Sequence, residues 1–592
     1  MSEDTYWERT DSFEEKLRLL EAAWRKKDFR LARSLTHSLR HTAMQAQAEE
    51  ESPGQPLAAP AQFATVESLP APWRTWARGW KYCRAIHLDE TLGIERPAEP
   101  VEVLLSFPAE QVTSLAREVR VARVVDGTLR EVPSQVHGEV RRGKKRLAKV
   151  LFMAGGAMHQ RQTLLVFHGN PEAELPAFPT DLETRGEGFA LDIENEFFKA
   201  SLSRQMGQLE RMAIKRGFGL ELFAGGEGHG EPPGIDWAHD YAAAGHFQKL
   251  RVTLWETCPD YEVVRGPLAT IVRRWGFPHS PVHPVFSPSR LHVDVEYRFY
   301  AGLPWFHKSG SMRAIKDFEA PALRDDEWVF SGQPFTDIVW LGPDGKVRTG
   351  AVDAALRDKL WGVGFFNRES KDAFVALFLE HRAEGLPELK HSASPTLYSP
   401  SHGHVWSRYP LPVKQVPAGA VLHQKNAYVV SPFTAADGPR MLEELRHRLV
   451  HPLLVSAGEM PPGADAKESP GRLARPGEAG DSPVPKQALW DALRDCKDEQ
   501  FYNAGLNVVD LGLVHDLRVR GDVVHVLMAM PHRGRPRLGY FAFGSGGNSM
   551  PVQRRLLQVP GVKKVIVEQT WEPGWNSNRL TAEGRRKLGL GG

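Results

Sequence analysis

The sequence predicts a mainly β protein, with a large antiparallel β-sandwich or supersandwich body, an N-terminal helical segment and a small C-terminal α+β domain. Three observations support this fold class. From about residue 98 to about 430, short runs rich in Val and Leu alternate with turn residues, as in antiparallel sandwiches. Helical periodicity is clearest before residue 50. A segment dense in Pro, Gly and charge, residues 457–485, separates the body from a final unit.

Length and charge bound the class of protein. A chain of 592 residues exceeds one hydrophobic core, so we expect several domains. The formal net charge of only +2 gives no global field that would attract nucleic acid or an anionic membrane. No apolar run is long enough for a transmembrane helix, and the polar N-terminus MSEDTYWERTDSFEEK is not a secretory signal. We therefore expect a cytoplasmic protein with neither a nucleic-acid nor a membrane partner.

The cysteines argue against a metal centre. Cys83, Cys258 and Cys496 lie far apart, and no CxxC motif occurs. A disulfide framework or a Cys-rich zinc or iron–sulfur site within one chain is therefore not expected. We predict no metal ligands, and the sequence leaves the cofactor unknown.

The N-terminal segment, residues 1–50, is predicted to form a helical hairpin arm. Ser12 and Glu15 have the spacing of a capping box. Apolar residues then recur at helical intervals in two stretches: Phe13, Leu17, Leu20 and Trp24, followed by Leu31, Leu35 and Leu39. Two short amphipathic helices cannot bury their stripes alone, so we expect them to pack on the body or on a partner subunit.

The β-rich region is predicted to form two parts, an N-terminal β-sandwich over residues 95–200 and a β-supersandwich over 201–456. Its strand-like runs include RLAKVLFMA, RQTLLVFHG, FALDIENEFFKASLS and LHVDVEYRFYAG. One helix is expected in DGPRMLEELRHRLVHPLL. Residues 457–485 are predicted to be a flexible linker that leads to the domain at 486–592.

The final unit carries a specific pattern. KQALWDALRDCKDEQ and MPVQRRLLQVPG are predicted helices, and VVDLGLVHDLRV, DVVHVLMAM and VKKVIVEQTW are predicted strands. The motifs VDLGLV and WEPGW, in this order, resemble the MIP18-like family, which includes iron–sulfur assembly factors and the PaaD-type subunits of phenylacetate degradation. The resemblance covers about residues 486–589. It implies a small α+β domain that works by docking to other proteins.

One position departs from that family. Its Gly-Cys-Pro motif corresponds to Gly534, Arg535 and Pro536 here. A thiolate can ligate a soft metal, whereas a guanidinium has only donors and stays protonated. The resemblance therefore implies a domain that has lost its metal-ligand cysteine. Arg533 and Arg537 flank Arg535 in the loop MPHRGRPRLGY.

The role of these arginines stays open at this point. They can bind a carboxylate or phosphate, pair with an acidic patch on a partner subunit, or form a solvated loop. Trp571 and Trp575 can form a recognition surface or a hydrophobic cap below the last helix.

A weaker resemblance covers roughly residues 95–420. The segments REVRVARVVDGTLREVPSQV, LLVFHGN, LDIENEFFKASLSRQMGQLERM and YEVVRGPLATIVRRW, in that order, resemble the β-supersandwich of family-38-type mannosidases and rhamnogalacturonan-lyase-like proteins. This resemblance implies a carbohydrate-active fold. The mannosidase catalytic barrel has no counterpart in the sequence, and no carboxylate pair for glycoside hydrolysis can be assigned.

The segment SPSHGHVWSRYPLP is the first candidate for catalysis. On a strand, His402, His404 and Arg408 share one face. Two such histidines can supply a general base or bind a metal, and Arg408 can neutralise a carboxylate beside the proton that is removed. Tyr409 is the further candidate acid or base. The alternative is a polar strand edge with one buried histidine.

The segment YRFYAGLPWFHKSGSMRAIKDFE is the second candidate. Trp305 offers an aromatic face for a sugar or aromatic ring, Arg313 a cation for an acid, and His307 a catalytic imidazole. The alternative is a strand pair with one wet face. A third, weaker candidate is GIDWAHDY, with His239 between two aspartates.

Three functions remain open from the sequence. The first is a subunit of a bacterial hetero-oligomeric catabolic enzyme complex, which binds another protein subunit and acts on a carboxylated aromatic or sugar ligand. The second is a carbohydrate-active lyase or hydrolase that acts through the β-supersandwich. The third is an iron–sulfur cluster assembly factor, against which the missing cysteine argues.

Overall fold

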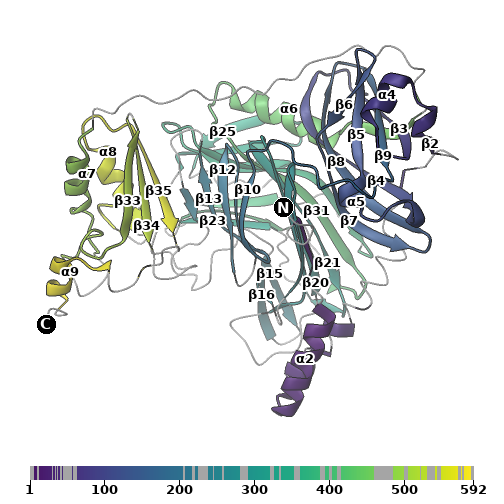
Figure 1. Ribbon diagram of the computed structural model, residues 1–592. Coiled ribbons are helices and arrows are strands. Elements are labelled where there is room, and N and C mark those ends of the chain that lie inside the picture. Colours follow the sequence, from purple (N-terminus) through teal and green to yellow (C-terminus); the bar gives the residue numbers. More distant parts are fainter. Residues whose placement is uncertain are drawn as a thin grey trace.

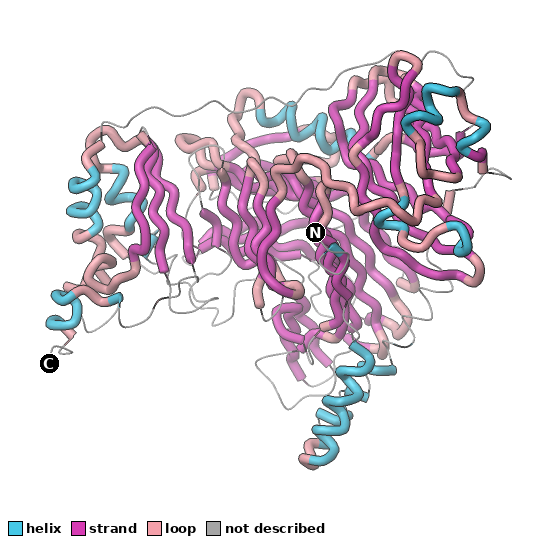
Figure 2. Tube along the Cα trace, in the orientation of Figure 1, coloured by secondary structure: helices cyan, strands magenta, loops and turns pink. Residues whose placement is uncertain are grey.

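The computed structural model places β-sheets through most of the chain and a small α/β unit at its C-terminal end (Figures 1 and 2). It describes residues 6–9, 12–29, 31–33, 35–36, 38–40, 43, 56–57, 63–204, 207–215, 221–223, 238–243, 246–255, 259–279, 291–319, 326–331, 335–352, 360–386, 394–398, 403–409, 415–458, 460, 484–498, 505–520, 522–529, 541–542, 544, 548–570, 575 and 579–588.

One ten-stranded antiparallel sheet forms the centre of the body, and the predicted mainly β class is confirmed. In spatial order its strands are β1 (Trp7–Arg9), β17 (Asp260–Arg265), β18 (Ala269–Gly276), β20 (Leu291–Tyr300), β21 (Trp305–Ala314), β31 (Val421–Val430), β27 (Ala373–Glu384), β26 (Gly362–Phe366), β24 (Asp337–Leu341) and β25 (Val347–Ala351). In β20, Tyr297 and Phe299 face one side of the sheet, so Glu296, Arg298 and Tyr300 face the other.

A five-stranded sheet covers one face of the large sheet. Its strands are β10 (Glu183–Glu187), β11 (Ala190–Glu194), β12 (Phe198–Leu202), β13 (Leu209–Ile214) and β14 (Glu221–Phe223). Apolar side chains of both sheets, among them Ile193, Phe198, Phe299 and Phe306, form one core. The sequence predicted FALDIENEFFKASLS as one strand, which is wrong. Asn195 ends β11 because its Oδ1 accepts the backbone N–H groups of the next turn.

Two further sheets belong to the body. One contains β19 (Pro278–His279), β16 (His246–Trp255), β15 (Ala238–Ala243), β22 (Phe318–Glu319) and β30 (Gln415–Val416). The other contains β23 (Asp326–Ser331), β29 (Gly403–Tyr409) and β28 (Ser394–Tyr398). Each contains one pair of consecutive strands, β15 with β16 and β28 with β29, and adds strands from distant parts of the chain. The pairing of these added strands is set by the packing of the whole body.

The N-terminal sandwich has two layers. The first is β2 (Ala64–Thr65), β3 (Tyr82–Asp89), β9 (Arg161–His168), β5 (Arg120–Val125) and β6 (Thr128–Val132), with β32 (Leu454–Gly458) paired to β3. The second is β4 (Arg96–Pro108), β8 (Lys145–Gly156) and β7 (Ser134–Arg142). This unit therefore includes residues before the predicted start at 95 and a strand that crosses from the predicted supersandwich into the predicted linker. Residues 183–200 lie in the five-stranded sheet instead.

Short helices cover the edges of these layers. They are η1 (Val66–Ser68), α4 (Ala71–Trp76), η2 (Ala109–Gln111), α5 (Leu115–Glu118) and the predicted α6 (Gly438–Val450). At the C-terminal end of α6, the Arg96 guanidinium donates to the carbonyl oxygens of Arg448 and His451, the groups that a helix end leaves free. Within the described part of the chain, no helix has the length and apolarity needed to span a bilayer.

The N-terminal arm starts at the edge of the large sheet. Strand β1 pairs with β17, and α2 (Ser12–Arg25) follows and projects away from the sheets (Figure 1, purple). The described residues between 29 and 43 are largely helical, and Ala32 and Leu35 pack against Ala23 of α2. Lys16 binds Asp260 of β17, with 2.8 Å between Nζ and Oδ2.

The C-terminal unit is a three-stranded sheet with helices on one side (Figure 1, yellow-green). Its elements are α7 (Lys486–Leu493), β33 (Val514–Arg520), β34 (Val523–Ala529), α8 (Val552–Leu557), β35 (Lys564–Thr570) and α9 (Ala582–Lys587). Strand β34 is antiparallel to β33 and parallel to β35. The predicted strand VVDLGLVHDLRV is half wrong, because Asn507 Oδ1 accepts the N–H groups of Val509 and Asp510 and holds a turn there.

Candidate functional site

The predicted site residues fall into three groups in the structure, apart from Trp575 of the C-terminal domain. Five of them lie outside the described residues: His402, Arg533, Arg535, Arg537 and Trp571. Three lie on β29: His404, Arg408 and Tyr409. That strand pairs with β23, where position 404 is the register partner of Phe330 and position 408 that of Asp326. The weaker candidate His239 lies on β15, in another sheet.

The remaining candidates from the body share strand β21. Trp305 is 3% exposed and packs on Tyr300, so its ring belongs to the core rather than to an open binding face. His307 is 7% exposed and lies on the same face of the sheet. Arg313 is exposed and lies six residues further along the strand, about 20 Å away at the usual strand rise. The fold therefore brings Trp305 and His307 together and separates them from Arg313.

His307 borders a cluster of charged residues between two layers. Its register neighbour is Arg298 of β20, and Arg298 lies between two carboxylates, Glu296 of its own strand and Glu102 of β4. Glu102 is there because β4 alternates: Val101 and Val103 point into the N-terminal sandwich, so Glu102 points towards the large sheet.

Glu102 collects contacts from three strands. His137 Nε2 of β7 lies 2.8 Å from Glu102 Oε2, and Lys149 Nζ of β8 lies 3.7 Å from Oε1. The Arg298 guanidinium donates to the same carboxylate across the layer boundary. The cluster thus ties the N-terminal sandwich to the large sheet. It remains open to water in part, since the Glu102 side chain is 25% exposed.

Charge fixes the protonation states in this cluster. Burial opposes ionisation of Glu296, but Arg298 and Lys149 lower its pKa to about 2. Against the same cost of burial, Arg298 and Lys149 hold the pKa of Glu102 well below its usual range. Burial, Lys425 and Arg298 hold the pKa of His307 well below its usual value. Two carboxylates are therefore ionised at neutral pH beside an uncharged imidazole.

The imidazole is held by a tyrosine. The Tyr300 hydroxyl lies 2.9 Å from His307 Nδ1, and burial raises the pKa of Tyr300. The other ring nitrogen, Nε2, is buried and has no hydrogen-bond partner among the described residues. A neutral imidazole oriented through one nitrogen can exchange a proton through the other. This pair, with the Glu102–Arg298–Glu296 row beside it, is the candidate site for chemistry on the body.

The opposite face of the same strand is closed. Lys308 and Asp326 are both 0% exposed, with 3.0 Å between Nζ and Oδ1. Asn426 Nδ2 and the Tyr428 hydroxyl both donate to Asp326 Oδ2. Lys308, Asn426 and Tyr428 all bind Asp326 in this second cluster. Such a satisfied network stabilises the fold.

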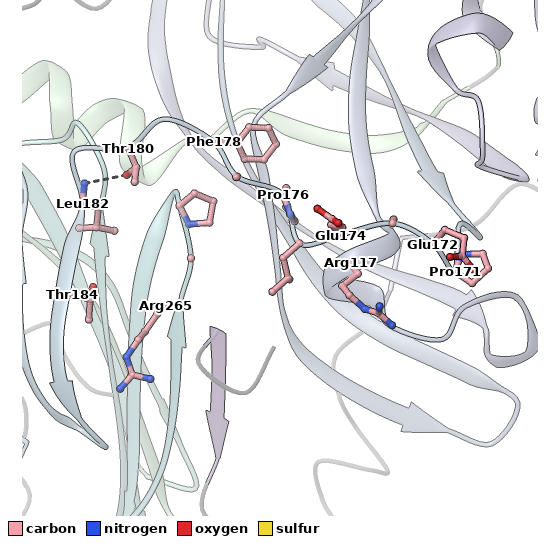
Figure 3. A pocket seen from close by; sticks show the side chains of 15 residues that line it. Arg117, Pro171, Glu172, Glu174, Pro176, Phe178, Thr180, Leu182, Thr184 and Arg265 are labelled. Atoms are coloured by element: carbon pink, nitrogen blue, oxygen red, sulfur yellow. Dashed lines mark hydrogen bonds between the residues drawn. The ribbon is translucent and has the colours of Figure 1, made fainter. Parts of the chain in front are cut away.

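A cleft of about 800 Å³ lies along the connector from the N-terminal sandwich to β10 (Figure 3). Arg117 and Arg265 line its two sides, and Glu172 and Glu174 line it from the connector. Arg265 is already paired with Glu8 at 3.0 Å. None of the predicted site residues lines this cleft, and we assign no chemistry to it.

The C-terminal domain buries its single cysteine. Cys496 is 0% exposed within the apolar core, and its Sγ lies 3.8 Å from the Ala492 carbonyl oxygen. Burial raises the pKa of this thiol to about 12, so it is protonated at neutral pH. Metal ligation needs a thiolate, so Cys496 is not available as a ligand in this fold. The described residues contain no group of three or more His, Cys, Asp and Glu side chains placed to hold a metal ion.

Trp575 takes one of the two roles that its sequence context allows. It is half-buried, packs on the core of the C-terminal domain, and donates from Nε1 to the Leu511 carbonyl oxygen at 2.7 Å. This is the role of a hydrophobic cap.

Sequence reasoning missed Glu102, Glu296, Arg298 and His137. A usable signal was present in LHVDVEYRFY, where charged and apolar residues alternate in a strand with both faces covered. Charges on a covered face must pair with charges from the covering layer.

Comparisons with known proteins give partial matches. No family model matches the chain. The chain is similar to the Fe-S protein maturation auxiliary factor YitW of Bacillus subtilis, with 26% identity over 106 residues, which are 18% of this chain and 94% of that protein.

Comparison with solved structures gives distant likenesses. A glycosyl hydrolase family 38 protein from Enterococcus faecalis matches 64% of this chain with 10% identity and a TM-score of 0.39. An α-mannosidase from Enterococcus faecalis V583 matches 67% with 10% identity and a TM-score of 0.38. This chain covers 47% of each of those two chains. Galactose 1-epimerase from Lactobacillus acidophilus NCFM matches 43% of this chain with 9% identity and a TM-score of 0.26.

Proposed function

We propose that this protein is a subunit of a hetero-oligomeric catabolic enzyme complex, in which the C-terminal domain docks on another protein and holds no metal. The observation that carries the proposal is the state of Cys496, which is buried, protonated and part of the apolar core. Without an available thiolate, the domain has no sulfur ligand for a metal. Its fold can still bind another protein.

The similarity to the maturation factor supports the docking half of this proposal. The match spans nearly the full length of that small protein, and we assign it to residues 486–592. That relative is an auxiliary factor in the maturation of Fe-S proteins, a role that involves other proteins. The second part of the proposal, that the complex is catabolic, depends on the resemblance to the PaaD-type subunits alone. We also propose a cytoplasmic location.

The arginine loop is the proposed contact. Arg533, Arg535 and Arg537 supply three guanidinium groups that match a patch of carboxylates on a partner. A flexible linker at residues 457–485, as the sequence predicts, would let residues 486–592 and the loop within them reach such a partner.

The experiment has two measurements on the full chain, affinity-purified from its own host. The first is iron and acid-labile sulfide per chain, for which the proposal predicts no stoichiometric amount. The second is recovery of a co-purifying protein at fixed stoichiometry.

Arg535→Glu should lower that recovery at least tenfold and leave the melting temperature unchanged. Arg518→Glu, an exposed control on β33, should leave the recovery unchanged. Full recovery with Arg535→Glu contradicts docking through the loop.

A second candidate function is a lyase or hydrolase acting on a carboxylated sugar through the body. The specific observation in its favour is the Tyr300–His307 pair, whose Nε2 lacks a partner among the described residues. The ionised Glu102 and Glu296 and the Arg298 cation lie beside it as groups for polar recognition.

Release of unsaturated products from uronate polymers by the isolated chain tests this second function. His307→Gln should abolish the release and Tyr300→Phe should reduce it, while Arg313→Gln, a distant residue on the same strand, should retain it. Release that survives His307→Gln excludes this pair as the site.

A further inference from the structure

The N-terminal arm exposes apolar residues that the rest of the described chain hides. Nine large hydrophobic side chains are exposed in the described part of the chain, and six of them belong to this arm: Phe13, Leu17, Leu19, Trp24, Phe29 and Leu31. The Trp24 side chain is 65% exposed. Contiguous exposed apolar surface of this kind marks an interaction site on a folded protein.

Three of these residues form one stripe on α2. Phe13, Leu17 and Trp24 fall within about 40° of one another at 100° per residue, and all three are exposed. The neighbouring flank of the helix is used inside the arm, where Ala23 packs on Ala32 and Leu35. Within the arm the Trp24 ring meets the edge of the Phe29 ring, with 5.5 Å between the centroids, and both residues still remain largely exposed. The stripe is therefore the face of α2 that the arm covers least.

The arm is fixed to the body rather than loosely attached. Lys16 of α2 forms a buried ion pair with Asp260, and the preceding strand β1 pairs with β17 in regular register. Trp7 Nε1 donates to Glu262 at 2.7 Å, and Tyr261 donates to Glu8 at 2.8 Å. Figure 1 shows α2 projecting from the sheets at this anchored base. The exposed stripe is therefore carried on a helix that is held to the body.

The charges beside the stripe identify the partner. The other flank of α2 carries exposed Glu14, Arg18, Glu21 and Arg25, in that order. Within one copy Arg25 Nη2 lies 3.3 Å from Glu21 Oε2, and such an exposed pair contributes little stability and can exchange partners. In a two-fold symmetric antiparallel helix pair, each flank faces the same flank of the partner, and residue i meets residue j while j meets i. This order then places Glu14 against Arg25 of the other copy, and Arg18 against Glu21.

We infer that α2 is a homodimer surface, on which a second copy of this chain packs its own α2 antiparallel, with the stripe of Phe13, Leu17 and Trp24 buried and the Glu14–Arg25 and Arg18–Glu21 pairs formed between copies. The apolar stripe supplies the affinity, since exposed aromatic residues at an interface centre carry most of the binding energy. The charge order supplies the direction.

Sedimentation of the full chain over a range of concentrations tests the dimer. A reversible monomer–dimer equilibrium is expected. Trp24→Glu should raise its dissociation constant by about 100-fold, and Trp24→Ala, a milder change at the same exposed site, should also weaken it. Met158→Glu is the matched control, because Met158 is 62% exposed and lies outside the arm. A chain that stays monomeric at every concentration, or a dimer that resists both Trp24 variants, overturns the inference.

A charge swap tests the direction of packing. Glu14→Arg places two arginines together at each end of the proposed interface and should weaken the dimer. Adding Arg25→Glu restores opposite charges across the interface, and should recover the affinity. Recovery by the double variant supports antiparallel copies of α2. If the double variant is as weak as Glu14→Arg alone, or if the chain associates only with a different protein, the antiparallel homodimer is excluded.

Discussion

The body and the C-terminal domain bury polar groups in opposite ways. The body places whole charges inside: Lys308 with Asp326 on one face of the large sheet, and Arg298 with Glu102 and Glu296 on the other. The described core of the C-terminal domain is apolar and contains one protonated thiol. Buried polar residues there, such as Asn507 and Asp510, hold a turn.

The difference indicates where chemistry can occur in each part. A body that already stabilises ionised carboxylates, a guanidinium and a neutral imidazole between its layers can recognise a polar ligand. In the small domain the described core is apolar, its thiol is protonated, and the buried Asp510 is already paired with Lys587, so its surface is what it offers to other molecules. The body is therefore the candidate for catalysis and the C-terminal domain the candidate for docking.

The largest expected effect comes from the closed network of the body. Asp326→Ala removes the carboxylate beside fully buried Lys308 and should destabilise the body by about 3–5 kcal/mol, measured by calorimetric unfolding. The double variant Lys308→Met/Asp326→Leu replaces the pair by apolar groups and should recover most of the loss. If Asp326→Ala leaves the stability unchanged, buried ion pairs do not distinguish the body from the C-terminal domain.

The layer-bridging cluster should give a smaller effect. Glu102→Gln weakens the contacts from His137 and Arg298 and should cost about 2 kcal/mol, because hydrogen bonds between charged groups are involved. Glu183→Gln, which breaks an exposed pair with Arg185, is the control and should cost less than about 0.5 kcal/mol. Equal losses of stability in the two variants would show that the cluster contributes no more than an exposed ion pair.

Acid should act on the body through its buried histidines. Burial and Arg84 lower the pKa of His168 to about 3, so the folded state holds this imidazole neutral while the unfolded chain takes up a proton below about pH 6.5. The unfolded state is thereby favoured as pH falls through this window, by about 1.4 kcal/mol per pH unit for one group.

The matching variant is His168→Gln. It should reduce the loss of stability between pH 6.5 and 5.5 by about 1 kcal/mol, since the unfolded imidazole is only partly protonated at the start of this interval, measured by denaturant unfolding at the two pH values. An unchanged pH slope would mean that His168 does not stay neutral in the folded body.

The smallest effect is expected in the C-terminal domain. Cys496→Ala removes one buried sulfur from an apolar core and should cost about 1 kcal/mol, measured by thermal unfolding. In the native full chain, the same thiol should resist alkylation until the protein unfolds, since it is buried and protonated. Rapid alkylation in the native state would contradict a sealed interior.

The sequence predicted well wherever a pattern is local. The alternation in LHVDVEYRFY gives a strand, and the periodicity of DGPRMLEELRHRLVHPLL gives α6, because side-chain spacing along one element decides both. Errors arose where one polar side chain overrides the pattern. Asn195 and Asn507 each accept backbone N–H groups and turn the chain inside a run that was predicted to be one strand.

The candidate site was predictable only in part. His307 was identified because its residue type suits catalysis, whereas Trp305, chosen for its aromatic face, belongs to the core. Their neighbour Glu102 is 196 residues from Arg298 in the sequence, and no local pattern encodes a contact between layers. Arg313 was grouped with His307 by closeness in sequence, although strand geometry places it far along the sheet.

The most direct test of the proposed role is anaerobic reconstitution of the full chain with ferrous iron and sulfide, followed by absorption and paramagnetic spectroscopy after desalting. A C-terminal domain that docks without metal predicts no cluster signal, and the same result for Cys496→Ser. A cluster that forms in the natural chain and disappears in Cys496→Ser would show that the buried thiol becomes a ligand, and would contradict the account.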